Sequence, residues 1–173
     1  MRYYATTEAL TFERWTMATT TRKPRRYAQG TTIDPAKSRA EIETIVTKHG
    51  ATGYVSGWQG NLVKVMFEMR GRRLRFSVDL PDVSDRQFTF DGHRRLPPAQ
   101  AQQRFEQFVR ERWRLLLFLI KGKLEAIRAG AAIFEEEMMA YTVMPNGQTV
   151  AEWANPQLAQ ILDRNEMPPL LPG

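Results

Sequence analysis

Apolar and polar residues alternate along residues 62–69 and 72–80, which is the period of a β-strand with one buried face. The apolar positions are Val63, Val65, Phe67 and Met69 in the first segment and Leu74, Phe76, Val78 and Leu80 in the second. A further strand is predicted over residues 52–58, between glycines, and Gln59-Gly60 and Arg70-Gly71 form tight turns. The pattern therefore predicts an antiparallel β-meander that Pro81 ends.

A helix is predicted before the meander, over residues 35–49, where apolar residues recur at helical spacing. Ser38 and Glu41 fit the S-x-x-E capping box, with Pro35 just upstream. Gly50 is suited to the left-handed conformation that closes many helices.

The longest predicted helix begins at Pro97-Pro98, and its apolar positions recur every three or four residues. Gly122 predicts a kink and Gly130 a stop. We expect this helix to cover the apolar face of the sheet. Residues 115–120 are apolar on all sides, so we expect them to be deeply buried or to contact a second subunit. A loop precedes the helix, with a short strand expected at residues 88–90.

Further helices are predicted towards the C-terminus. Residues 131–141 carry one apolar stripe, and a turn at 144–147 separates two segments suited to a small hairpin. Thr149 and Glu152 fit a second capping box, which starts a helix running to about residue 162, interrupted or kinked at Pro156.

This order of elements indicates an α+β fold. It has an N-terminal helix, a three-stranded antiparallel β-meander, a long helix packed on one sheet face, and C-terminal helices. We expect a flexible basic arm at residues 1–34, an α-β-β-β-α core at 35–130, and a helical extension with a proline-rich tail at 131–173. Met17, followed by Ala and Thr, resembles an ordinary start, so one hypothesis is that residues 1–16 extend the reading frame upstream.

The charge of the chain suggests a polyanionic partner. The net charge is +6, the sequence pI is about 9.9, and arginine far outnumbers lysine. Such a balance favours nucleic acid first and an anionic membrane surface second, although solubility alone would also explain it. The chain has no cysteine, no signal peptide and no apolar run long enough for a bilayer, so we expect a soluble cytoplasmic protein.

The second turn and third strand of the meander carry four arginines. Alternation directs Arg73 and Arg75 away from the core, while Arg70 and Arg72 flank the turn. Guanidinium groups bind phosphate, and aromatic residues in a basic groove stack on bases. The predicted nucleic-acid site comprises Arg70, Arg72, Arg73, Arg75, Lys64, Tyr54 and Trp58, with Arg25 and Arg26 of the basic arm. Alternatively, the aromatic residues pack at the core or rim, and the arginines pair with Glu68, Asp79 and Asp82.

The sequence gives little support for a second basic binding site, a metal site or a catalytic site. A second basic set, Arg94, Arg95, Arg104, Arg110, Arg112 and Arg114, is interleaved with glutamates, as on a solvated helix face. Residues 135–137 are three consecutive glutamates, which point in different directions on a helix and do not predict a metal site. We see no nucleophile–base pair and no glycine-rich phosphate loop. We therefore predict no enzymatic activity, no cofactor and no metal.

Several segments resemble uncharacterised proteins encoded by bacteriophages and prophages. The resemblance is carried by Ser38-Arg39-Ala40-Glu41-Ile42-Glu43, the glycine-bounded run from Gly50 to Gly60, Pro145-Asn146-Gly147-Gln148-Thr149-Val150, and Met167-Pro168-Pro169-Leu170-Leu171-Pro172. It implies a phage or prophage context and no catalytic residues. The order of a helix, three strands and a long helix is also similar to phage single-strand annealing proteins, which bind DNA in a basic groove as rings or filaments.

The sequence therefore predicts an oligomeric phage or prophage protein that binds nucleic acid, with single-stranded DNA favoured because aromatic residues neighbour the arginines. The alternative is a protein-interaction module, structural or host-modulating, that uses the apolar helix and the tail with Leu170 and Leu171.

Overall fold

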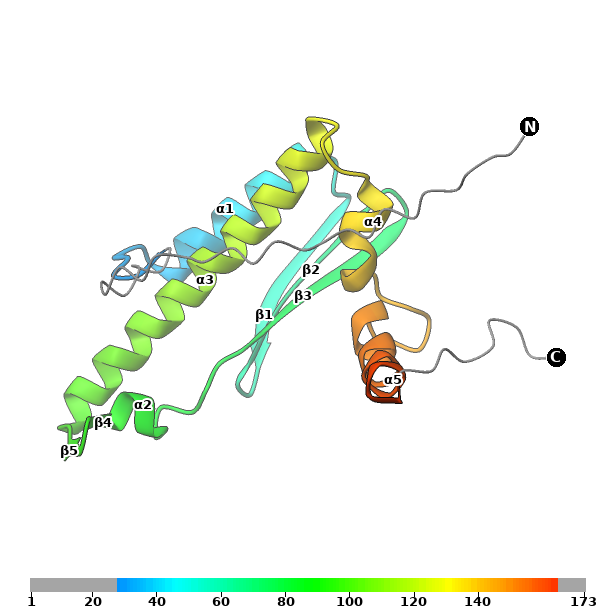
Figure 1. Cartoon of the computed structure of the whole chain (residues 1–173). Helices are drawn as coiled ribbons and strands as arrows, with labels where there is room; N and C mark the ends of the chain where they lie inside the picture. Colours follow the sequence, from blue (N-terminus) through cyan, green and yellow to red (C-terminus); the bar gives the residue numbers. More distant parts are fainter. Residues whose placement is uncertain (1–27, 165–173) are drawn as a thin grey trace, which may run out of the picture.

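The structure is a computed structural model, and it describes residues 28–164. It confirms the α+β class (Figure 1). The elements in chain order are α1 (Pro35–Lys48), β1 (Gly53–Gln59), β2 (Leu62–Met69), β3 (Arg72–Asp79), α2 (Arg86–Thr89), β4 (Phe90–Asp91), β5 (Arg94–Arg95), α3 (Pro98–Arg128), α4 (Phe134–Met138), the 3₁₀ turn η1 (Met139–Tyr141) and α5 (Val150–Arg164).

The predicted meander is present as an antiparallel sheet of order β1-β2-β3. Its register places Phe67 opposite Tyr54 on one side and Leu74 on the other. Arg70 and Gly71 both have positive φ, 50° and 72°, as expected for the two central residues of a tight hairpin turn between strands. The strand boundaries therefore agree with the sequence pattern to within a residue or two.

Two parallel helices cover the apolar face of the sheet. Glu41 of α1 pairs with Arg114 of α3, and His49, just after α1, lies beside Glu125 further along α3, so both helices run in the same direction. The main core joins these helices to the sheet and to α4. Its members are Ile42, Val46, Val63, Val65, Phe67, Met69, Leu74, Phe76, Trp113, Leu116, Leu117, Ile120, Leu124, Phe134 and Met138. The long helix thus packs where the sequence places it, with α1 beside it.

The helix α1 starts at Pro35, as predicted, but its capping residue differs from the prediction. Asp34 is the cap, and its carboxylate accepts a hydrogen bond from the Ala36 N–H at 2.6 Å. Proline is tolerated in the first turn because the first N–H groups of a helix have no intrahelical partner. The helix therefore starts at Pro35, and Ser38 lies inside it, fully buried, instead of forming a capping box with Glu41. The left-handed cap at Gly50, with φ of 94°, is confirmed.

The helix α3 is continuous through Gly122, where a kink was predicted, and the chain turns at Gly130 with φ of 72°. Its first turns support a separate small cluster, in which the Phe88 ring meets Phe105 and Phe108 edge-to-face. The strand predicted at residues 88–90 is wrong in part. Phe88 belongs to α2, where the helical turn directs its ring into this cluster, and β4 begins only at Phe90.

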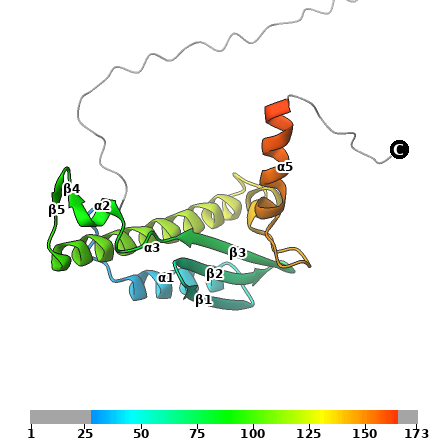
Figure 2. The same cartoon turned by 90° about the horizontal axis from the view of Figure 1, so that it is seen from below.

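The C-terminal segment returns to the free edge of β3. The Val143 N–H donates to the Arg73 carbonyl at 2.8 Å, and Val143 bridges Thr149 in the expected small hairpin. The capping box is confirmed: Thr149 N–H donates to the Glu152 carboxylate, and Glu152 N–H donates to the Thr149 hydroxyl. The helix continues past Pro156. Figure 2 shows α5 standing away from the sheet, and no residue of α5 is fully buried.

Candidate nucleic-acid interface

The register of the sheet places the predicted site residues on two opposite faces. Tyr54 lies opposite Phe67 and Trp58 opposite Val63, so both aromatic residues share the face that the helices cover. Arg73 and Arg75 lie on the outer face, because they alternate with buried residues of β3. The expectation that Tyr54 and Trp58 line a groove with Arg73 and Arg75 is therefore wrong, because the pairing register places these aromatic residues on the opposite face from both arginines.

Tyr54 and Trp58 both contact Arg39 of α1. The Tyr54 hydroxyl donates to the Arg39 carbonyl at 3.2 Å, and burial raises the pKa of Tyr54 above its usual value. The Arg39 guanidinium lies 5.9 Å from the Trp58 ring centroid, and Trp58 is 71% exposed. Tyr54 therefore packs against the core, as the alternative interpretation expected, whereas Trp58 stays largely exposed beside Arg39.

Arg73 and Arg75 already have partners on the outer face. Arg73 bonds to Glu68 on the neighbouring strand at 3.1 Å, as the alternative interpretation expected. The Arg75 side chain is only 14% exposed; it donates to the Gly147 carbonyl at 2.9 Å and forms an ion pair with Glu152. Arg75 therefore stabilises the contact between β3 and the start of α5 and is not open to a ligand.

The outer face as a whole carries little net charge. Lys64 lies on it and donates to the Gln59 side chain at 3.3 Å. Within the described residues, its cations are Lys64, Arg73 and Arg75, and its carboxylates are Glu68, Asp79 and the bound Glu152. These charges balance, so the sheet face is not the positive surface that the sequence suggested.

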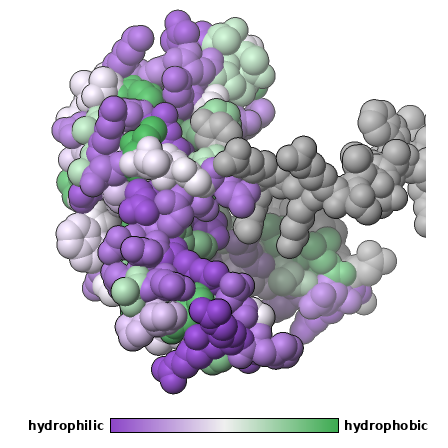
Figure 3. Space-filling model, turned by 90° about the vertical axis from the view of Figure 1, so that its left-hand side faces the viewer, coloured by the Kyte–Doolittle hydropathy of each residue, from purple (hydrophilic) through white to green (hydrophobic). Residues whose placement is uncertain are grey.

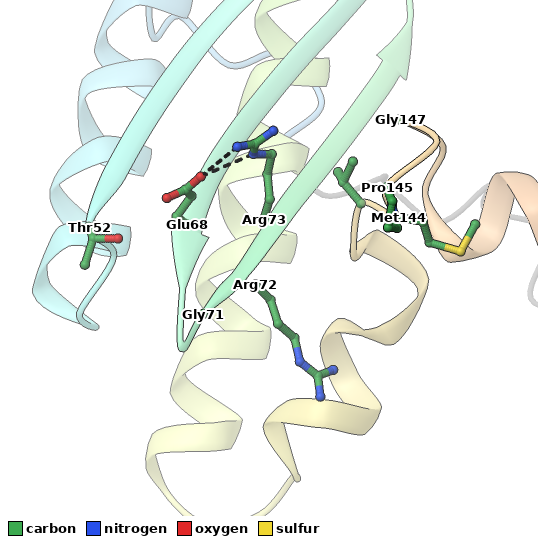
Figure 4. A pocket seen from close by; sticks show the side chains of 9 residues that line it. Thr52, Glu68, Gly71, Arg72, Arg73, Met144, Pro145 and Gly147 are labelled. Carbon is green, nitrogen blue, oxygen red and sulfur yellow. Dashed lines mark hydrogen bonds and ion pairs between the residues drawn. The ribbon is translucent and has the colours of Figure 1, made fainter.

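Arg70 and Arg72 lie at the end of the sheet, at the β2–β3 turn. Figure 4 shows Arg72 pointing towards α4, on the other side of the strand from Arg73 and Glu68. Arg70 lies over the buried Phe134 ring at 4.8 Å from its centroid. Within residues 28–164, neither guanidinium has a carboxylate within ion-pair distance.

Two hollows flank this turn. One, of about 450 Å³, is lined by Arg72, Arg73 and the loop around Pro145. The other, of about 400 Å³, has Lys48, Arg70 and Arg128 in its lining above a floor that includes Met69, Leu124 and Phe134. We call Lys48, Arg70, Arg72, Arg73 and Arg128 the turn-end surface.

The predicted site did not include Lys48 or Arg128, although both lie in the last turns of predicted helices, α1 and α3. Cations at helix C-termini interact favourably with the backbone dipole, so both have a structural reason to be there. Arg128 also binds Glu125 at 2.6 Å, and this hydrogen bond lowers the pKa of that carboxyl. Arg70 and Arg72 belong to no helix and have no carboxylate partner within residues 28–164, so neither a helix dipole nor an ion pair explains their positions.

Four arginines of the second basic set are engaged within the protein, two along α3 and two with residues of other elements, and not with the interleaved glutamates as expected. Arg104 binds Asp91, Arg110 binds Gln107, Arg112 lies over Phe108, and Arg114 binds Glu41. Arg94 and Arg95 differ, because both are exposed on β5 and have no carboxylate partner among the described residues.

The remaining predicted features add no chemistry in the described part of the chain. Glu137 pairs with Lys123 at 2.6 Å, and no group of three histidine or carboxylate side chains there is placed to hold a metal ion. Of the helices between residues 28 and 164, none has the length and apolar character needed to cross a bilayer. Arg25, Arg26, Leu170 and Leu171 lie outside the described residues.

Comparisons with protein-family models, curated proteins and solved structures found no match to this chain.

Proposed function

We propose that this chain is a nucleic-acid-binding protein of phage or prophage origin that contacts phosphates through the turn-end surface. The observation that carries the proposal is the pair Arg70 and Arg72, two guanidinium groups at one hairpin turn that have no carboxylate partner within residues 28–164. Arginine is the side chain best suited to bind phosphate oxygens in a bidentate manner.

The contacts of the neighbouring residues support phosphate binding at this surface. The turn is a tight two-residue connection, which limits the backbone positions of both arginines. Lys48 shares a hollow with Arg70, while Arg73 and Arg128 each keep an exposed guanidinium against a single carboxylate. A surface of this kind binds the backbone electrostatically and does not depend strongly on sequence.

Base stacking has no support at this surface. Tyr54 and Trp58 lie on the helix-covered face of β1, and the Phe134 ring is buried beneath Arg70. We therefore expect the turn-end surface by itself to bind single strands and duplexes alike.

The test is the double variant Arg70→Glu with Arg72→Glu. We expect affinity for a fluorescent oligonucleotide to fall at least tenfold at low salt. The slope of log affinity against log salt should also decrease by roughly 1.4 for single strands, because two phosphate contacts are lost. Fluorescence polarisation with single-stranded DNA, duplex DNA and RNA across a salt series measures both quantities. Arg75 is unsuited to this test because reversing its charge would break the contact with Glu152.

A matched control is Lys37→Glu with Arg164→Glu, which changes the net charge equally at two exposed positions outside the turn-end surface. The control should bind nearly as well as the wild type. Equal binding by the Arg70/Arg72 variant and the wild type at every salt concentration would refute the proposal.

A second candidate function is a protein-interaction module, because α5 exposes apolar side chains. Trp153 and Leu158 are half exposed and Leu162 is 78% exposed on a helix without a buried residue. A flat salt response with every oligonucleotide, together with specific recovery of one phage or host protein that depends on Leu158 and Leu162, would favour this function over nucleic-acid binding.

A further inference from the structure

A hollow of about 770 Å³ lies beside the first turns of α3, at the opposite end of that helix from the turn-end surface. Five of the ten glutamines of the chain line it: Gln29, Gln87, Gln100, Gln103 and Gln107. They come from three segments, namely the residues before α1, the short helix α2 and the helix α3. Such a concentration of one side chain from separate segments is not explained by the amphipathic pattern of any single helix.

The helix α3 contributes its glutamines from one face. Gln100, Gln103 and Gln107 are spaced by three and four residues, which places them in a row along the helix. Their row faces α2, which packs on α3 through the Phe88 ring. The hollow is therefore formed by the packing of α2 against α3.

Of the five amides, that of Gln107 is structural, and those of Gln87, Gln100 and Gln103 are available to a ligand. Gln107 donates to the Thr31 carbonyl and to Glu111 and accepts from Arg110, which leaves its amide fully engaged. Gln87, Gln100 and Gln103 are exposed, and their side-chain amides form no hydrogen bond to another described residue. Three primary amides thus offer both donors and acceptors to a ligand in the hollow.

An apolar surface lies among these amides. Phe88 and Phe108 both line the hollow, and Phe88 is only 3% exposed, so its ring is held by the surrounding packing. Arg104 and Glu111 also line the hollow, but Arg104 pairs with Asp91, and Glu111 accepts from the Gly30 N–H and from Gln107. The remaining aromatic floor and neutral amides suit a flat ligand whose edges both donate and accept hydrogen bonds. It does not suit an isolated phosphate, whose oxygens only accept.

Unpaired cations lie at the same end of the molecule. Figure 1 shows α2, β4 and β5 gathered at the start of α3, and Figure 3 shows a densely hydrophilic surface at this lower end. Arg94 and Arg95 are exposed there and have no carboxylate partner in the described part of the chain. A ligand that combines flat polar rings with phosphates would match both features.

We propose that this hollow binds unpaired nucleobases of a single strand through Gln87, Gln100 and Gln103, while Arg94 and Arg95 contact the adjacent phosphates. This inference rests on the proposed nucleic-acid-binding function and adds a base-dependent subsite to it. Base edges carry the donors and acceptors that a glutamine amide can pair with, and in a single strand these edges are accessible.

The test compares two probes of equal length and charge, a single-stranded oligonucleotide and its abasic analogue. We expect the wild type to bind the base-bearing strand about tenfold more tightly, and Gln100→Ala with Gln103→Ala to remove most of that difference. The salt slope should not change, because no phosphate contact is lost. Alanine favours helix more than glutamine does, so both substitutions preserve α3.

The matched control is Gln157→Ala with Gln160→Ala on the exposed helix α5, which should keep the full preference for the base-bearing strand. Equal wild-type affinity for the two probes would overturn the inference and leave the proposed function standing. Persistence of the preference in the Gln100/Gln103 variant would also overturn it. Absence of binding to either probe at low salt would refute the proposed function itself, and this subsite with it.

Discussion

Arg75 shows how a single side chain decides the accessibility of a whole sheet face. Its guanidinium bonds to the Gly147 carbonyl and to Glu152, and Glu152 in turn caps the first turn of α5 through the Thr149 N–H. One carboxylate therefore satisfies both a helix terminus and an arginine from β3. The contact joins the C-terminal helix to the sheet. It also neutralises the positive charge that strand alternation places on the outer face at Arg75.

We predict that Arg75→Ala lowers the free energy of unfolding by about 1–3 kcal/mol, since its bonds are partly shielded from solvent. Arg73→Ala is the natural comparison. This substitution also removes an arginine–glutamate pair from β3, but the Arg73 and Glu68 side chains are both more than half exposed. The loss of unfolding free energy should therefore stay within about 1 kcal/mol. Urea unfolding of the two variants measures the difference, and equal losses would contradict the role assigned to Arg75.

At the scale of the elements, the start of α1 depends on which of two polar residues caps it. Asp34 satisfies the Ala36 N–H, whereas the Ser38 hydroxyl is buried one turn later without a hydrogen-bond partner in the described residues. Starting the helix at Pro35 adds a turn to the parallel pair of α1 and α3. The same choice places Ser38 in the interior.

We therefore predict opposite results for two alanine substitutions. Asp34→Ala should lower the free energy of unfolding by about 1 kcal/mol through loss of the cap. Ser38→Ala should be neutral or slightly stabilising, because it removes a buried hydroxyl without a partner. Thermal melts followed by circular dichroism distinguish the two residues, and a larger loss from Ser38→Ala would show that Ser38 is the cap.

At the scale of the whole molecule, residues 28–164 contain two apolar clusters spaced along one helix. With 31 residues, α3 is about 46 Å long, and only its middle and end pack on the sheet. Its first turns carry the separate Phe88 cluster with α2 and the β4–β5 hairpin. This arrangement places the glutamine-lined hollow and the turn-end surface at opposite ends of a rigid element.

Two phenylalanine substitutions should separate these clusters. Phe88→Ala is expected to speed amide hydrogen exchange in residues 85–96 while the three-stranded sheet stays protected. Phe67→Ala should lower the free energy of unfolding by about 3–5 kcal/mol and expose the whole sheet together. Hydrogen exchange resolved by residue distinguishes the outcomes, and loss of sheet protection in Phe88→Ala would indicate a single cooperative core.

The elements were predictable where a local pattern determines them. Alternation identified β2 and β3, the turn at Arg70-Gly71 follows from the glycine, and Thr149 with Glu152 forms its own capping box. The orientation of Arg73 followed from the same alternation. These features depend on neighbours in the chain, which is why one sequence contains enough information to place them.

The candidate site was predicted less well, because its character depends on partners distant in the chain. Arg75 and Glu152 are 77 residues apart, and no local signal joins them. Alternation also implies that Tyr54 and Trp58 share a face, but only the pairing register shows that this face is the one opposite Arg73.

By itself, the sequence determined the α+β class, the meander and the placement of arginines around one turn, because periodicity and turn chemistry are local properties. Only the tertiary structure decided which of these arginines remain without partners. Ion pairs form between strands and helices that the fold brings together, so the neutralised sheet face and the open turn-end surface became apparent only after packing.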